Sequence, residues 1–118
     1  MKLTREFSFE AAHNLEWHKG KCHDIHGHSY KLFITLEGQL NDNDVVIDFS
    51  DFKKIVNKNV IDKLDHKYIN DIIPNPTAES MTLWIADQIK GEFGNLNIKL
   101  HTIKLYETEK CCAEETFV

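Results

Sequence analysis

Alternating apolar and polar residues predict strands toward both ends of the chain. Between residues 3 and 13, Leu3, Phe7 and Phe9 share one parity while polar residues fill the other. Residues 26–37 and 96–105 alternate in the same way, and a period of two with one apolar face indicates a half-buried strand. The apolar parity changes after Leu100, which predicts a bulge. Residues 45–47 and 116–118 are predicted to form two further short strands.

Two segments between these strands have apolar residues at helical spacing. The first runs from Phe52 to Leu64, with Asp48 or Ser50 as the residue that caps its start. The second begins after Pro76, with Thr77 as its cap. Strands on either side of a helical block are typical of an α+β domain, in which helices cover one side of an antiparallel sheet.

Size, charge and cysteine content narrow the class of protein. The 118 residues make one domain of ordinary composition, 42% hydrophobic and 28% charged. No apolar run approaches the roughly 20 residues of a membrane span, and residues 1–6 do not resemble a secretory signal. The net charge of −5 argues against nucleic acid as a partner. Three cysteines do not make a disulfide framework, so we expect a cytoplasmic location.

Histidines are the unusual feature of the composition. There are seven, and five of them lie between residues 13 and 28. His26 and His28 are two apart in a predicted strand and so point to the same face. Antiparallel pairing of residues 3–13 with 26–37 would bring His13 beside them. Three neutral imidazoles leave a fourth tetrahedral position open, the pattern of a catalytic zinc site. His18 and His23, in the loop between, are less favoured as ligands, although a ligand or proton role for His23, directly after Cys22, stays open.

Three further groups allow more than one interpretation. Cys22, four residues before His26, could be a fourth metal ligand, a packed thiol, or a base whose pKa is lowered by zinc and Lys21. Asp65 and His66, at the end of the first helix, could share a proton, although a solvated helix end is the simpler interpretation. Glu107 lies on the last long strand, where the simpler interpretation is an exposed strand end.

Taken together, these residues resemble the 6-pyruvoyl tetrahydropterin synthase family over nearly the whole chain. The segments that carry the resemblance are Phe9–His13, Cys22–Tyr30, Val46–Phe49, Leu64–Asn70, Asn75–Glu79 and Glu107–Thr108. The resemblance implies the tunnelling fold, a four-stranded antiparallel sheet with two helices on one face in the order ββααββ, as a single domain over residues 1–118. Family members are hexamers of two stacked trimers with active sites between subunits, so we expect a homo-hexamer.

The resemblance also implies a metal and catalytic residues. It places Zn²⁺ on three ligands and a base on the neighbouring loop: His13, His26 and His28 would be the ligands, and Cys22 the base. It makes the Asp65–His66 pair a proton carrier.

The remaining roles concern a pterin triphosphate substrate. Glu107 would anchor the pterin through its amino and ring N–H groups, with Thr108 and Thr77 nearby. His23, Cys111 and Cys112 receive no role.

The spacing within the cysteine motif favours one branch of the family. Three residues separate Cys22 from His26, as in the synthases that form 6-carboxy-5,6,7,8-tetrahydropterin for queuosine biosynthesis. We therefore expect a lyase that converts 7,8-dihydroneopterin triphosphate to that product with release of triphosphate and acetaldehyde. A branch that forms a hydroxymethyl-pterin has glutamate in place of Cys22. The alternatives are a 6-pyruvoyl-tetrahydropterin synthase, a non-catalytic zinc- or pterin-binding module, and a closed structural zinc site with Cys22 as fourth ligand.

Overall fold

The computed structural model describes residues 1–118, except for the side chain of residue 95. Its elements follow one another as β1 (Lys2–His13), η1 (Lys21–His23), β2 (His26–Gly38), α1 (Phe49–Val56), η2 (Asn57–Ile61), α2 (Asp62–Leu64), β3 (Lys67–Tyr68), η3 (Ile69–Asp71), α3 (Ala78–Ile89), η4 (Gly94–Leu96), β4 (Ile98–Thr108) and β5 (Cys111–Thr116). Elements η1, η3 and η4 are 3₁₀ turns, and η2 is a π-helical segment that joins α1 to α2.

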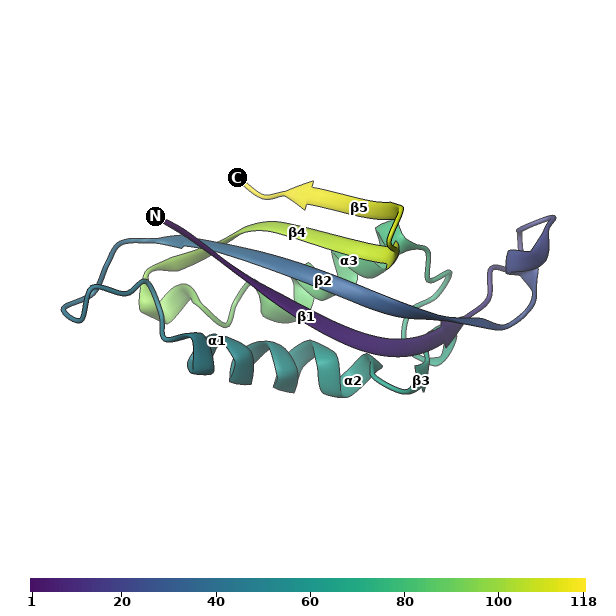
Figure 1. Ribbon diagram of the computed structural model, residues 1–118, viewed down its shortest axis with the longest axis horizontal. Helices are drawn as coiled ribbons and strands as arrows, with labels where there is room; N and C mark the ends of the chain where they lie inside the picture. Colours follow the sequence, from purple (N-terminus) through teal and green to yellow (C-terminus); the bar gives the residue numbers. More distant parts are fainter.

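The sheet has five strands in the order β3-β1-β2-β4-β5 (Figure 1). The α+β class is as predicted, but the four-stranded, wholly antiparallel sheet is wrong, because β3 pairs with β1 in parallel. The fifth strand, β5, lacks the alternation that marks a strand, since every residue in it except Ala113 is exposed. The strand predicted at residues 116–118 is misplaced, because the observed strand is Cys111–Thr116. The strand predicted at residues 45–47 is wrong: these residues form a loop in which Val46 and Ile47 are buried.

The two longest strands form a single antiparallel ribbon that sets the geometry of the site. Register runs from Lys2 opposite Glu37 to His13 opposite His26, as the predicted pairing required. Where β2 pairs with β4, the register shifts between Thr35 and Leu36. This irregularity confirms the bulge that the change of apolar parity predicted.

Both helical segments begin at the caps that the sequence predicted. The Asp48 carboxylate accepts a hydrogen bond from the Ser50 amide at 2.7 Å, and the Thr77 hydroxyl accepts one from the Ser80 amide at 3.0 Å. In the first segment, fully buried residues recur every four positions: Phe52, Val56, Val60 and Leu64. In an α-helix of 3.6 residues per turn, residues four apart would turn progressively away from the sheet. The π-helical turn of η2 has more residues per turn and so keeps these side chains on the buried face.

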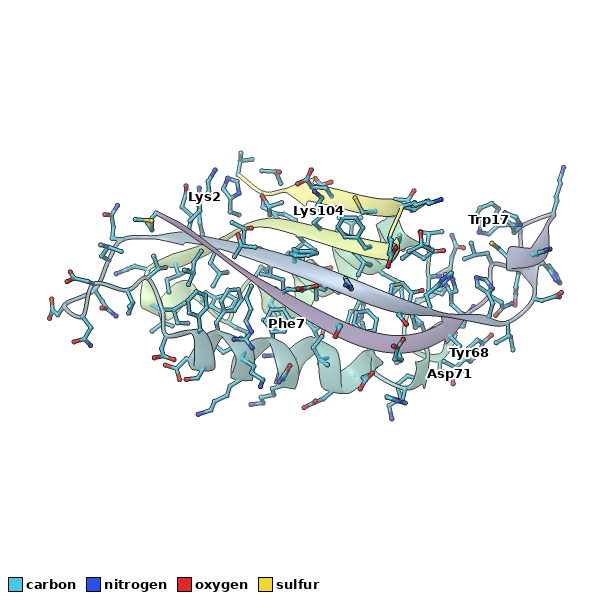
Figure 2. The ribbon with its side chains drawn as sticks, in the orientation of Figure 1. Lys2, Phe7, Trp17, Tyr68, Asp71 and Lys104 are labelled. Carbon is cyan, nitrogen blue, oxygen red and sulfur yellow. The ribbon has the colours of Figure 1, made fainter. Side chains whose placement is uncertain are left out.

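The helical segments cover one face of the sheet and leave the other exposed (Figure 1). Side chains of one parity from β1, β2 and β4 form the core against the helices, among them Phe7 in Figure 2. Polar residues of the other parity, such as Glu6 and Lys31, lie on the open face. Among the described residues, no helix has the length and apolar character needed to cross a membrane.

Candidate metal centre

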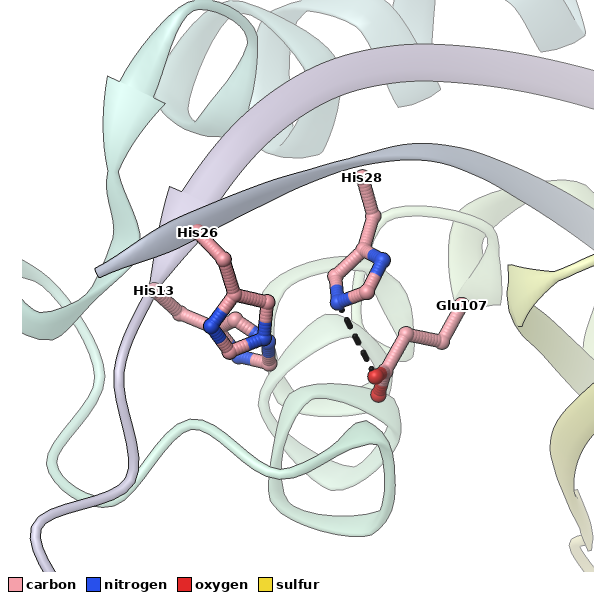
Figure 3. Close-up of side chains that lie close together, drawn as sticks. All are labelled: His13, His26, His28 and Glu107. Carbon is pink, nitrogen blue, oxygen red and sulfur yellow. Dashed lines mark ion pairs between the residues drawn. The ribbon is translucent and has the colours of Figure 1, made fainter. Parts of the chain in front are cut away.

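Strand pairing brings three histidines together at one end of the ribbon. His13 is the last residue of β1 and lies directly opposite His26, the first residue of β2, while His28 follows two residues later on the same face. The ring centroids are 4.6 Å apart for His13 and His26, 5.1 Å for His13 and His28, and 4.9 Å for His26 and His28. One potential ligand atom from each histidine and one from Glu107 all lie within 4.8 Å of one another (Figure 3).

Backbone carbonyls orient two of the three imidazoles. The Nδ1 atom of His13 lies 2.7 Å from the Pro76 carbonyl oxygen, and Nδ1 of His26 lies 2.8 Å from the carbonyl oxygen of Asp24. Because a carbonyl oxygen can only accept, each Nδ1 carries the proton and each Nε2 presents a lone pair. This is the arrangement in which a metal-binding histidine is held by its second nitrogen.

The three Nε2 atoms are the unsatisfied part of the cluster. Within the part of the chain that the structure describes, Nε2 of His13, His26 and His28 is buried without a hydrogen-bond partner. Such a buried polar atom costs about 1–3 kcal/mol when nothing binds it. Three imidazole nitrogens gathered within 4.8 Å of one another suit a divalent cation that accepts imidazole ligands, so the residues fit a metal centre of the zinc type.

Glu107, at the end of β4, joins this group. Its Oε1 lies 3.0 Å from Nε2 of His28, in a direction that does not satisfy the geometry of a hydrogen bond. Burial lowers the pKa of His28, the Glu107 carboxylate opposes this, and the imidazoles of His13 and His26 lower it further. The net lowering favours the neutral imidazole that a metal requires. The sequence analysis placed Glu107 at the pterin but not beside the histidines. Its position follows from the antiparallel pairing of β2 with β4, in which Lys31 lies opposite Tyr106, the residue before Glu107.

Tyr30 forms the floor of the cluster and was not among the predicted site residues. Its side chain is fully buried, stacks on Phe9 at 4.9 Å and meets the edge of His28 at 5.5 Å. Its hydroxyl has no hydrogen-bond partner among the described residues. Burial raises the pKa of Tyr30 well above its ordinary value, and the Glu107 carboxylate raises it further, so the phenol remains neutral.

Cys22 lies on the loop that joins β1 to β2, within η1, and is partly exposed. The ligand atoms that cluster in the described residues come from three histidines and Glu107, and the Cys22 sulfur is not one of them. His18 and His23 are likewise outside that group. The structure therefore brings together the three predicted histidine ligands and leaves Cys22 on the adjoining loop.

Asp65 and His66 lie at the edge of β1, where the first helical segment ends. The Asp65 carboxylate accepts a hydrogen bond from the Glu10 amide at 2.9 Å, and the His66 amide donates to the Glu10 carbonyl oxygen at 2.5 Å. His66 has a φ of +60°, uncommon for a residue other than glycine, and its Nδ1 lies 3.1 Å from Asp65 Oδ1. The hydrogen bond from the Glu10 amide is the largest of the effects that lower the pKa of Asp65.

The Asp65–His66 pair lies at the edge of β1 that pairs with β3, and neither residue belongs to the group of clustered ligand atoms. A hollow of about 570 Å³ beside His66 is lined by residues of both parities, among them Glu10, Ser29 and the cluster residue His28. Glu10 and Ser29 have the parity opposite to that of His13, so their side chains point to the open face of the sheet. Within this one chain, the structure does not join the two predicted catalytic groups.

The two predicted threonines have local partners. Thr77 caps α3 and is adjacent to Pro76, whose carbonyl orients His13. The Thr108 hydroxyl accepts a hydrogen bond from the Lys110 amide at 3.3 Å at the turn between β4 and β5. Their contact with a substrate stays a prediction.

Comparison with known proteins identifies the family. Residues 2–116 match the family model described as 6-pyruvoyl tetrahydropterin synthase. The chain belongs to this family. A Haemophilus influenzae protein named 6-carboxy-5,6,7,8-tetrahydropterin synthase is 47% identical over 86 residues, which cover 70% of this chain and 61% of that protein's length. A Pyrococcus furiosus protein named dihydroneopterin monophosphate aldolase is 36% identical over 109 residues, which cover 90% of this chain and 89% of that protein.

A solved structure has the same fold. The structure of Caenorhabditis elegans 6-pyruvoyl tetrahydropterin synthase superimposes with a TM-score of 0.86, covering 100% of this chain and 96% of the other at 24% identity. At that identity the likeness concerns the fold alone. It confirms the α+β tunnelling fold that the motifs implied.

Proposed function

We propose that this chain is a 6-carboxy-5,6,7,8-tetrahydropterin synthase, which converts 7,8-dihydroneopterin triphosphate and one water molecule to the carboxy-pterin with release of acetaldehyde and triphosphate. The observation that carries the proposal is the cluster of three buried, unpartnered Nε2 atoms on His13, His26 and His28. Family membership and the 47% identity to the Haemophilus protein of that name support the choice of reaction. The reaction belongs to queuosine biosynthesis.

The three histidines would hold Zn²⁺, because neutral nitrogen ligands at three positions leave one open for substrate. When bound, the ion would act as a Lewis acid toward the side-chain oxygens of the substrate. Tyr30, buried beneath the rings and kept neutral, excludes water from the inner side of the cluster.

Protons would be moved by Cys22 on one side of the substrate and by an Asp65–His66 pair on the other. Cys22, on the loop next to His26, would remove a proton from the substrate side chain. The Asp65 carboxylate, whose lowered pKa keeps it ionised at neutral pH, would hold the proton on Nδ1 of His66. Nε2 of His66 is then free to accept a proton and return it, and its 79% exposed side chain leaves that atom accessible.

Glu107 would position the pterin. A carboxylate accepts two parallel hydrogen bonds from an amino group and a ring N–H, which matches the donor edge of a pterin. The distance of 3.0 Å between Glu107 Oε1 and His28 Nε2 supports this role, because a ring bound to Glu107 would lie next to the metal site. Thr108 and Thr77 would bind nearby.

The complete site would form between copies of a single domain that spans residues 1–118. Asp65 and His66 lie at the edge of β1 and outside the group of clustered ligand atoms, so a neighbouring copy would supply them to the site. Such assembly would also cover β5, whose exposed edge is otherwise open to pairing. We propose a homo-hexamer of two trimers.

Product analysis tests the proposal. Zinc-loaded protein is incubated with 7,8-dihydroneopterin triphosphate, the pterin product is identified by mass, and acetaldehyde is assayed. We expect the carboxy-pterin and acetaldehyde in equal amounts. A pyruvoyl-pterin without acetaldehyde would assign the rival synthase, and a hydroxymethyl-pterin would assign an aldolase like the Pyrococcus protein. Binding of zinc and substrate without turnover would leave only a binding module.

Replacement of Cys22 by alanine tests its role against a matched control. We expect Cys22→Ala to reduce turnover by at least about 100-fold, the lower end of the range for loss of a general base, while bound zinc stays at the wild-type level. Cys112→Ala removes an exposed thiol on β5 and should leave turnover unchanged. Loss of zinc in Cys22→Ala would instead favour the closed structural site.

A further inference from the structure

We propose that Asn70 is a positioning residue for this reaction, which acts through Asn14 on the loop that carries Cys22. The inference rests on the proposed role of Cys22 as the base. Residues 14–25 join β1 to β2, and the loop projects from one end of the molecule (Figure 1). Trp17 and Ile25 in this loop are 60% and 66% exposed, and Leu15 is half-buried, so apolar packing of the loop is slight. Hydrogen bonds to the rest of the chain therefore contribute to its shape.

The Asn70 side chain holds the start of the loop from both sides. Its Oδ1 accepts a hydrogen bond from the Asn14 amide at 3.0 Å, and its Nδ2 donates to the Asn14 carbonyl oxygen at 2.9 Å. The side-chain amide of Asn70 thus bonds both backbone groups of Asn14, the residue after the end of β1. It takes the place of the backbone partner that a strand neighbour would supply.

The Asn14 side chain passes this constraint to the segment of Cys22. Its Nδ2 donates to the His23 carbonyl oxygen at 3.3 Å, and its Oδ1 accepts a hydrogen bond from the Tyr68 hydroxyl. The next residue, Leu15, donates its amide to the Cys22 carbonyl oxygen at 2.8 Å. The His23 carbonyl is therefore held by Asn14, which Asn70 and Tyr68 fix in place, and the Cys22 carbonyl is held by Leu15, the next residue along the chain.

A single segment of the chain holds both proposed proton-transfer groups. Asp65 and His66, which begin this segment, are bonded to the Glu10 backbone, and Tyr68 and Asn70 follow directly. Farther along, Asn75 accepts a hydrogen bond from Trp17 Nε1 at 2.6 Å, a second tie to the loop. Figure 2 shows Tyr68 at the same end of the molecule as Trp17. The geometry of Cys22 therefore depends on side chains outside its own loop.

The test uses the full chain with Cys111→Ser and Cys112→Ser, so that Cys22 is the one remaining thiol of the three in the sequence. In this background Asn70→Ala is compared with Tyr68→Phe, a milder change that removes only the hydroxyl. Asn59→Ala is the matched control, because Nδ2 of Asn59 donates to the Ile55 carbonyl at 2.8 Å within the helical segment, away from the loop. The readouts are hydrogen exchange at the Leu15 amide, the alkylation rate of Cys22 by iodoacetamide, kcat, KM and bound zinc.

We expect Asn70→Ala to speed hydrogen exchange at the Leu15 amide about 10-fold. Without the two Asn70 hydrogen bonds, local opening of the loop costs less free energy and so occurs more often. Alkylation of Cys22 should become about 3-fold faster, and kcat should fall about 10- to 100-fold, the effect of a misplaced catalytic group. KM and zinc content should stay at the wild-type level. Tyr68→Phe should shift the same readouts in the same direction by less, and Asn59→Ala should shift none.

Unchanged Leu15 exchange and Cys22 alkylation in both variants would overturn the inference, whatever happens to turnover. Faster Leu15 exchange and Cys22 alkylation with a wild-type kcat would also overturn the inference. If the protein with native Asn70 has no turnover, the proposed function fails instead. The exchange and alkylation data would still show whether Asn70 holds the loop, so the two failures are distinguishable.

Discussion

Removal of the metal should lower the melting temperature sharply, and one histidine substitution should abolish the effect. Without an ion, three buried Nε2 atoms lack hydrogen-bond partners, each at a cost of about 1–3 kcal/mol, and only that of His28 has the Glu107 carboxylate near it, at 3.0 Å. An ion present at 1,000 times its dissociation constant stabilises the folded state by about 4 kcal/mol. For a domain of this size, 1 kcal/mol corresponds to a melting-temperature shift of about 4 °C. Chelation should therefore lower the melting temperature by about 15 °C.

The His26→Ala variant separates metal binding from packing. It removes one of the unpartnered nitrogens together with the bond from Nδ1 to the Asp24 carbonyl at 2.8 Å. These two effects oppose each other, so the metal-free variant should be within about 1 kcal/mol of the metal-free wild type. Addition of zinc should raise the melting temperature of the wild type and leave the variant nearly unchanged.

Differential scanning fluorimetry with chelator or with excess zinc measures both effects. His101→Ala is the control, because His101 lies on β4 and its Nδ1 is 2.6 Å from the neighbouring Thr102 hydroxyl, apart from the cluster. It should keep the full zinc-dependent shift. A wild-type shift below about 2 °C, or a shift of equal size in His26→Ala, would refute the assignment of the three nitrogens as metal ligands.

Two further predictions concern stability. The pKa of Asp65 is lowered from its ordinary value of 3.8, so its ionised form stabilises the fold above that pH, and this contribution is lost as pH falls through the lower folded-state pKa. In urea unfolding, the difference in free energy of unfolding between wild type and Asp65→Asn should therefore shrink between neutral pH and about pH 3. Asp87→Asn, which alters a surface ion pair with Lys90, should show no such trend. Thr77→Ala should reduce the free energy of unfolding by about 1 kcal/mol through loss of the α3 cap, whereas Thr116→Ala at the exposed end of β5 should change it by less than about 0.5 kcal/mol.

Local periodicity was sufficient to predict the parts of the fold that have one buried face. The long strands, the capped starts of both helical segments and the bulge near His101 all follow from apolar spacing, because each element packs one side against the core. Strand β5 could not be found in this way, since an exposed edge strand has no apolar parity to detect. Residues 45–47 were wrongly predicted as a strand for the opposite reason. Val46 and Ile47 are buried apolar residues, but they lie in a loop that does not pair with a strand.

The site was predictable where chemistry and strand parity coincide. His26 and His28 share a face by spacing alone, and antiparallel pairing then brings His13 to them. Glu107 reaches the cluster through a long-range pairing of β2 with β4, and its register is not encoded near Glu107 in the sequence. The bonds of Asn70 to Asn14 join residues 56 positions apart, so spacing rules could not reveal them.

The most direct test of the metal centre is X-ray absorption at the zinc edge of the purified, zinc-loaded protein. The arrangement of His13, His26 and His28 predicts a first shell of three imidazole nitrogens and one oxygen ligand, with no sulfur. A sulfur in the first shell would contradict the account, because Cys22 would then close the site and could not serve as the base.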